Sequence, residues 1–296
     1  MRRALGGALL GVLIAARPAG AGQGLDVHGL RPPADPFGYV AVPGSGALAA
    51  GRGHVAVYVS DAHEPLEGEG PATAAVQRLA TLEVVAGLGL VNLGRGRAIQ
   101  LGVGLPLVLD VDGHGPDGGR LQAGLLGDVR AELKAGFGDA AERGLGWMAR
   151  TVLEWPTGRQ RAFVSDGGLG WQLELGLEAV RSSLRGALVL GCEWLPGEAR
   201  TPGVRAGDRL RLGAALGWAA LRDLAGLEHL EAVFELRHAV RLGDPYARSS
   251  EVALELEGAI RYRDRRWLVL AGGGGRLGRG AGAAQSRWCV AAGWNF

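Results

Sequence analysis

The sequence alternates apolar side chains with polar or small ones, and this period of two restricts the possible folds more than any other feature. Between residues 251 and 262 one face carries Val252, Leu254, Leu256, Gly258, Ile260 and Tyr262, and the other carries Glu251, Ala253, Glu255, Glu257, Ala259 and Arg261. An amphipathic helix would instead repeat about every 3.6 residues. The pattern therefore predicts an all-β chain whose strands have two different faces.

Applied along the chain, this period predicts about twelve strands, an even count. They are expected at residues 53–60, 79–92, 97–110, 124–137, 144–156, 170–182, 184–195, 208–221, 227–242, 250–262, 266–275 and 286–296. Short and long connections then alternate, as in outer-membrane barrels with short periplasmic turns and longer external loops. The turn at 138–143 is longer than the other short ones, and 39–42 could add one further short strand.

Charged side chains of both signs occupy mid-strand positions on one face. Charges face hydrocarbon only at high cost, whereas they can line a wet or salt-bridged lumen. The residues expected to line the lumen are Glu83, Arg130, Glu132, Arg150, Glu174, Arg211, Glu235, Arg237, Glu255 and Glu257. A closed barrel also leaves no unpaired strand edge in lipid. We therefore expect a closed antiparallel transmembrane β-barrel.

Tryptophan placement favours a membrane barrel over a soluble sandwich or lipocalin-like barrel, in which large aromatics would fill strand centres. All eight Trp lie on the apolar face and toward strand ends. One expected aromatic girdle, near the external boundary, contains Trp155, Trp171, Trp194 and Trp288. The other, near the periplasmic boundary, contains Trp147, Trp218, Trp267 and Trp294.

The last strand carries Trp288, Val290, Trp294 and Phe296 on one face. It resembles the carboxy-terminal signature of outer-membrane barrels, in which a terminal aromatic closes an alternating strand. The resemblance implies that Phe296 is an insertion signal recognised by the barrel-assembly machinery.

Three stretches carry a closer resemblance: Gln100–Leu109, Leu126–Arg130 with its continuation to Ala135, and Pro156–Gly158. They resemble the barrel module of some OmpA-family proteins and the family of phenol-degradation-pathway outer-membrane transporters. The resemblance implies an outer-membrane barrel that passes small solutes. This sequence ends at the barrel's terminal Phe without a periplasmic domain, so the tethering of the cell wall by the larger proteins does not carry over.

The amino terminus has the features of a secretory signal peptide. Arg2 and Arg3 precede an apolar stretch, and Ala19-Gly20-Ala21 is a small-residue cleavage site. We therefore expect a signal peptide at 1–21, a Gly/Pro-rich lead-in segment at 22–52 and the barrel at 53–296. No later stretch is apolar for the 18 to 20 or so residues of a membrane-spanning helix. The expected location is the outer membrane of a Gram-negative bacterium, with membrane lipid and lipopolysaccharide as partners.

Other functional classes find little support. Basic and acidic residues number 32 and 30 and are dispersed, which argues against nucleic acid as a partner. No common hydrolase or phosphate-loop motif is present, and neither a cofactor nor a metal site is expected. Cys192 and Cys289 have opposite parity, so no disulfide is expected between them.

We expect a porin-like pore or transporter for small solutes and not an enzyme. One alternative is a closed structural barrel in which the inward acids and arginines pair across strands and fill the lumen. A second is an outer-membrane phospholipase. For that reading the outward-facing His238 is the one clear candidate, and no Ser is placed convincingly beside it.

Overall fold

Twelve long strands form the body of the protein in a computed structural model that describes residues 25–66, 75–94, 96–115, 119–138, 140–159, 163–195, 199–201, 204–224, 227–243, 246 and 252–296. The strands are β2 (Gly53–Leu66), β3 (Ala75–Gly94), β4 (Arg97–His114), β6 (Val129–Phe137), β7 (Leu145–Trp155), β9 (Gly170–Arg181), β10 (Leu184–Trp194), β13 (Arg209–Leu224), β14 (Leu227–Arg241), β15 (Val252–Arg263), β16 (Trp267–Arg276) and β17 (Ser286–Asn295).

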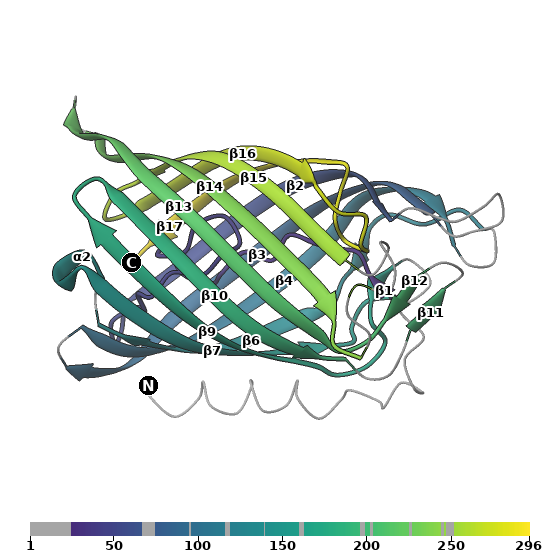
Figure 1. The fold of residues 1–296 in the computed structure, drawn as a ribbon, viewed down its shortest axis with the longest axis horizontal. Coiled ribbons are helices and arrows are strands. Elements are labelled where there is room, and N and C mark those ends of the chain that lie inside the picture. The colour runs from purple at the N-terminus through teal and green to yellow at the C-terminus, as the bar shows by residue number, and fades with distance from the viewer. Residues whose placement is uncertain are drawn as a thin grey trace.

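Each long strand pairs antiparallel with its neighbours in sequence, and β17 pairs with β2 to close the sheet (Figure 1). Across this seam the Gly53 N–H donates to the Phe296 carbonyl at 2.8 Å, and the Phe296 N–H donates to the Gly53 carbonyl at 2.9 Å. Closure leaves no long edge in the sheet, which is the condition for spanning lipid with strands. The predicted fold class, a closed antiparallel barrel of about twelve strands, is confirmed.

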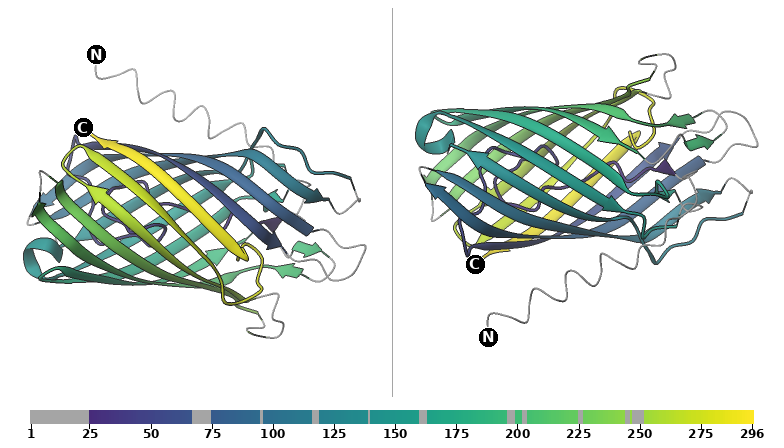
Figure 2. Two further views of the ribbon diagram at one scale, coloured as in Figure 1. Left: turned by 90° about the horizontal axis from the view of Figure 1, so that it is seen from above. Right: turned by 90° about the horizontal axis from the view of Figure 1, so that it is seen from below.

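The two ends of the barrel differ in their connections (Figures 1 and 2). One end, here called the turn end, has tight turns, the chain terminus Phe296 and the one-turn helix α2 (Ala140–Arg143). The other, here called the loop end, has the longer connections and two pairs of short strands. These are β1 (Leu25–Asp26) with β8 (Val164–Ser165), and β11 (Ala199–Thr201) with β12 (Val204–Ala206). A fifth, β5 (Leu125–Leu126), pairs with β4.

Strand boundaries differ from prediction mainly at the loop end. β2 continues to Leu66 and β4 to His114, beyond the expected ends at 60 and 110, because their pairing with β3 continues past the alternating stretch. The expected long turn at 138–143 contains α2. The further strand considered at 39–42 does not form, because this stretch follows bends inside the barrel.

The two faces of each strand meet different surroundings. On β9, Trp171, Leu173, Leu175 and Leu177 are exposed on the outside, whereas Gln172 and Glu174 are buried inside. The exterior is thus an apolar band and the charged face points inward, the reverse of a soluble barrel. Cys192 and Cys289 are both free. Within the described residues, no helix has the length and apolar character to cross a membrane.

The described part of the expected lead-in segment lies inside the barrel, whereas the expected signal peptide at 1–21 lies outside the described residues. From β1 at the loop end, residues 25–52 run through the lumen to the turn end, where β2 begins, and nearly all of them up to Leu48 are buried (Figure 2). Alternation had assigned no packed position to these residues because a Gly/Pro-rich stretch has no strand period. We call residues 25–52 the N-terminal segment.

Candidate functional site

The lumen is the candidate functional site, and the structure places the expected lumen-lining side chains on its inner face. Glu83, Arg130, Glu132, Arg150, Glu174, Glu235, Glu255 and Glu257 are buried, and Arg211 and Arg237 are partly exposed. Many of them pair across neighbouring strands. Arg150 on β7 contacts Glu132 of β6 at 3.1 Å and Glu174 of β9 at 2.8 Å. Arg130 on β6 reaches across β4 to pair with Glu83 on β3.

The same pairing of arginines with carboxylates continues along the wall between strands β14, β15 and β17. Arg237 on β14 contacts Glu255 at 2.8 Å and Glu257 at 2.6 Å on β15, and Arg287 on β17 contacts the same two carboxylates at 3.3 and 3.6 Å. Buried charges of opposite sign therefore neutralise each other along much of the wall. Such pairs hold strand positions, although their desolvation offsets much of their attraction.

The backbone of the N-terminal segment is bound by barrel carboxylates. Glu235 accepts hydrogen bonds from three consecutive amides, those of Val40, Ala41 and Val42. Glu178 accepts from the Ser45 amide at 2.7 Å and from its hydroxyl at 2.8 Å. Hydrogen bonds to ionised acceptors are stronger than neutral ones, so these two residues are main attachment points of the segment.

Barrel arginines bind the carbonyls of the same segment. Arg185 donates to the carbonyls of Phe37 and Gly38, both at 2.9 Å, and Arg237 donates to the Gly29 carbonyl at 2.6 Å. Further donors are Arg261 to Gly38 and Arg263 to Pro36. The wall thus recognises backbone groups that an irregular segment would otherwise leave unsatisfied.

Two charged side chains of the segment complete the attachment. Arg31 contacts Asp26 at 2.9 Å, Glu193 at 3.2 Å and also Glu154. Asp35 contacts Lys134 at 2.7 Å and accepts from the Gln100 amide at 3.0 Å, and neither Asp35 nor Lys134 has exposed side-chain surface.

An apolar core fills the middle of the lumen. Leu30, Tyr39 and Val42 of the segment pack in one cluster with barrel side chains that include Val85 and Met148. All five are nearly inaccessible to solvent. Because packed apolar groups leave no room for water, the lumen in this conformation is occluded at that level.

A second attachment lies at the loop end, where β1 pairs with β8. The Asp26 amide donates to Asp166, at 3.0 Å, and the Asp166 amide donates to Asp128, at 3.2 Å. Burial raises the pKa of the Asp128 carboxyl to about 7, and the charge of Asp26 adds to the shift. Burial also raises the pKa of Asp166 to about 7, against the charge of Arg209 and with that of Asp26. We call β1 and β8, together with the neighbouring carboxyls of Asp128 and Asp166, the latch.

The expected girdle tryptophans lie on the outer face, mostly about half exposed. Trp171 and Trp194 stack at 4.5 Å between ring centroids, and Trp267 and Trp294 stack at 6.4 Å, each pair within one expected girdle. Trp147 stacks on Phe137 at 4.1 Å. The remaining members are Trp155, Trp218 and Trp288. Phe296 lies on the outer face beside Trp294, at 6.0 Å.

His238 faces outward from β14 and stacks on Tyr246 at 6.0 Å between ring centroids. Ser250, the nearest serine considered for a phospholipase, lies outside the described residues. In the described part of the chain, no three His, Cys, Asp or Glu side chains group as ligands for a metal ion.

Alternation alone missed every contact made by the N-terminal segment. Arg31, Asp35, Glu178, Arg185 and Glu193 are central to the site and were not among the expected residues. One signal was present in the sequence: apolar residues such as Leu30, Tyr39, Val40 and Val42 in a segment with no strand pattern need somewhere to be buried.

Solved structures show what this architecture is similar to. An outer-membrane channel from Pseudomonas putida F1 superposes with a TM-score of 0.58 at 15% identity, covering 85% of this chain and 98% of that one. The β domain of the Bordetella autotransporter BrkA gives 0.50 at 15% identity, covering 83% and 99%. The fold is that of an outer-membrane β-barrel. At this identity the likeness concerns the fold alone.

Sequence comparisons with protein families and curated proteins find no match. No protein-family model matches the chain, and no curated protein matches it significantly. The case for function therefore depends on the lumen itself.

Proposed function

We propose that the protein is an outer-membrane channel for small polar solutes, with the N-terminal segment as a plug in its lumen. The observation that carries the proposal is a closed twelve-strand barrel with an apolar exterior and a charged interior. The similar fold of the Pseudomonas putida channel supports it. The similar Pseudomonas putida structure is that of a channel, which favours transport over phospholipase chemistry.

The proposed location follows from the same features. Cleavage after Ala21 would release the mature chain into the periplasm, and the barrel-assembly machinery would recognise the strand that ends at Phe296. The loop end would then face the cell exterior and contact lipopolysaccharide, with the turn end in the periplasm.

Planar-bilayer recording of the purified protein tests the proposal. We expect only small, infrequent conductance steps from the wild type, because the apolar packing around Met148 occludes the lumen until the N-terminal segment moves. A variant lacking residues 25–50 should give steps several-fold larger. Glu235→Gln is a milder companion that keeps the chain length and weakens the binding of three backbone amides.

Heat-modifiable migration in gels serves as the control that each variant still forms a barrel. If the deletion variant folds and gives no conductance, the channel proposal is wrong. That outcome would support the second candidate, a closed structural barrel, which is favoured by the occupied lumen and by the paired charges of its wall.

A further inference from the structure

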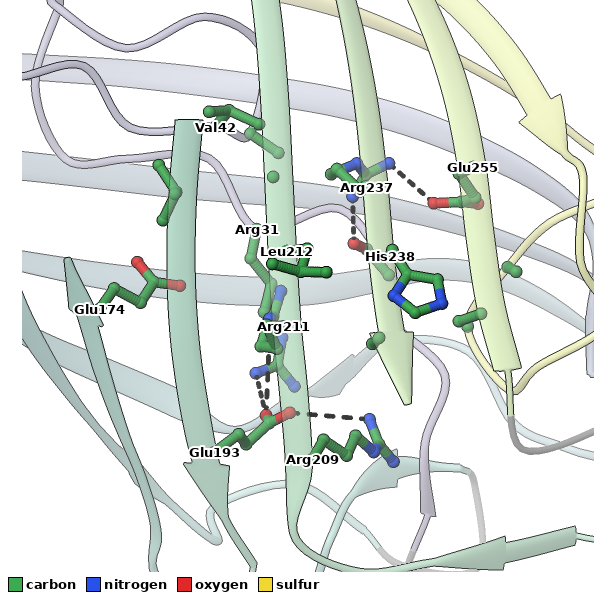
Figure 3. Close-up of a pocket in the computed structure, with 18 of the residues that line it drawn as sticks. Arg31, Val42, Glu174, Glu193, Arg209, Arg211, Leu212, Arg237, His238 and Glu255 are labelled. Atoms are coloured by element: carbon green, nitrogen blue, oxygen red, sulfur yellow. Dashed lines mark hydrogen bonds and ion pairs between the residues drawn. The ribbon is translucent and has the colours of Figure 1, made fainter. Parts of the chain in front are cut away.

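A small cavity lies inside the loop end of the barrel, between the N-terminal segment and strands β10, β13, β14 and β15 (Figure 3). Its volume is about 90 Å³, enough for several water molecules or one small ion. The space exists because Gly213, Ala239 and Ala253, on three consecutive strands, contribute almost no side chain there.

Two arginines of β13 line this cavity without a carboxylate of their own. Arg209 and Arg211 each contact Glu193, at 3.9 and 3.6 Å, which is beyond hydrogen-bond distance. Among the described residues, Glu193 is the carboxylate that either guanidinium approaches within 4 Å. Their side chains are 18% and 26% exposed, so solvent reaches both.

Glu193 is already engaged elsewhere. Its Oε1 atom accepts from Gln172 at 2.9 Å and from Arg31 of the N-terminal segment at 3.2 Å. Arg237, across the cavity, has Glu255 and Glu257 as its carboxylate partners. The other arginines of the cavity are therefore neutralised by close contacts, and the pair on β13 is not.

The cavity also has buried polar atoms without a partner in the described part of the chain. They are Oε2 of Glu193 and Nε of Arg237. A buried polar atom left unbonded destabilises the protein, so a ligand that bonds to it is favoured. The guanidinium donors require acceptor oxygens, and Oε2 of Glu193 requires a donor such as a hydroxyl.

We propose that Arg209 and Arg211 form a binding site for the oxyanion group, carboxylate or phosphate, of a small solute that enters from the loop end. A guanidinium binds such groups through two parallel hydrogen bonds, which an ammonium cannot reproduce. A hydrogen phosphate has both the acceptors for the arginines and a hydroxyl for Glu193. The physiological role of the site rests on the proposed channel function.

Isothermal titration of the full-length barrel in detergent tests the site at constant ionic strength, with inorganic phosphate and acetate as separate probes. We expect saturable one-to-one binding by the wild type. The double variant Arg209→Gln/Arg211→Gln should lose at least about tenfold in affinity, which corresponds to about 1.4 kcal/mol. Arg211→Lys keeps the charge but not the planar fork, and should fall between the two.

Arg78→Gln is the matched control. Arg78 also lies near the loop end, on β3, but it is paired with Asp61 at 2.6 Å and does not line the cavity. Its loss should leave anion binding unchanged. Tighter binding of phosphate than of acetate assigns a phosphate-bearing solute that uses the Glu193 acceptor, and tighter binding of acetate assigns a carboxylate.

The site is refuted if the wild type binds neither probe, or if the folded double variant binds as tightly as the wild type. Because titration does not require conduction, anion binding by a barrel that never conducts would overturn the channel function and leave the site intact. Conduction without anion binding would refute the site and leave the channel function intact.

Discussion

At the scale of single residues, the Asp35–Lys134 pair is the most completely buried link between the N-terminal segment and the wall. Replacing Lys134 with Met removes the cation and leaves Asp35 charged and unpaired among buried groups. We expect this to destabilise the folded protein by about 3–5 kcal/mol, a typical cost of breaking one side of a buried pair. Thermal unfolding followed by gel migration or circular dichroism measures the loss.

The double variant Asp35→Asn/Lys134→Met is the matched control. It removes both charges, so most of the lost stability should return. A double variant as unstable as Lys134→Met alone would mean that the pair acts through packing and not through charge.

Residue parity could be predicted from the sequence, but contact partners could not. Alternation assigned Glu235 and Arg237 to the inner face, where the structure places them. Within the N-terminal segment their partners are backbone groups of residues 29–42, and backbone groups carry no sequence signal. A carboxylate that binds three amides is therefore invisible until the irregular segment is placed.

At the scale of elements, the latch should respond to pH. Asp128 and Asp166 have pKa values raised to about 7 in the latched protein, against an ordinary value near 3.8. The latched state therefore binds more protons than the released state between these values. Latching is therefore strongest at low pH and weakens as the pH rises from about 4 to about 7, by up to about 1.4 kcal/mol per pH unit for each carboxyl, and it levels off above pH 7.

Deuterium exchange of the backbone amides at 25–31, corrected for the intrinsic effect of pH, measures this change. Protection should fall between pH 5 and pH 7 and change little above pH 8. In Asp128→Asn/Asp166→Asn the fall should disappear, because the two amides do not titrate. An unchanged pH dependence in that variant would assign the effect to other nearby groups, which are Asp26, Arg31, Glu154, Glu193 and Arg209.

Elements with a clear period were predictable, and irregular ones were not. The strands β9 and β10 begin where alternation predicts and end within a residue of it, because their two faces meet lipid-like and lumen-like surroundings along their whole length. β2 and β4 run on past the predicted stretches, where they stay paired with β3 and Leu66 and Val111 pack in a second apolar cluster with Leu25 of the N-terminal segment. The one-turn helix α2 and the latch are too short to have a period.

At the scale of the whole molecule, the barrel has an apolar exterior, as a membrane protein needs, and a packed apolar cluster in its lumen, like the core of a soluble protein. The middle of the lumen excludes water, and polar contacts lie on both sides of it. Release of the N-terminal segment would expose buried carboxylates and arginines together. Under the proposed channel function, conduction would be coupled to the stability of the segment, a linkage that strand patterns alone do not contain.

The position of the barrel in the bilayer gives the last prediction. Trp147 and Trp155 lie eight positions apart on β7. At about 3.3 Å per residue and a tilt near 40°, they are separated by roughly 20 Å along the membrane normal, close to an apolar band of about 25 Å. Tryptophan fluorescence in vesicles should therefore be quenched more by lipids brominated near the headgroup than by lipids brominated near the bilayer centre.

A tryptophan introduced at mid-strand provides the comparison, because it should show the opposite preference. Leu188 lies in the middle of β10 with its side chain on the outer face, 64% exposed, so Leu188→Trp in a background with the native tryptophans replaced by Phe places one indole at the expected bilayer centre. Restoring Trp171 alone in the same background places one in a girdle. Equal quenching of the two single-tryptophan proteins at both depths would show that the aromatic rings do not mark the membrane boundaries.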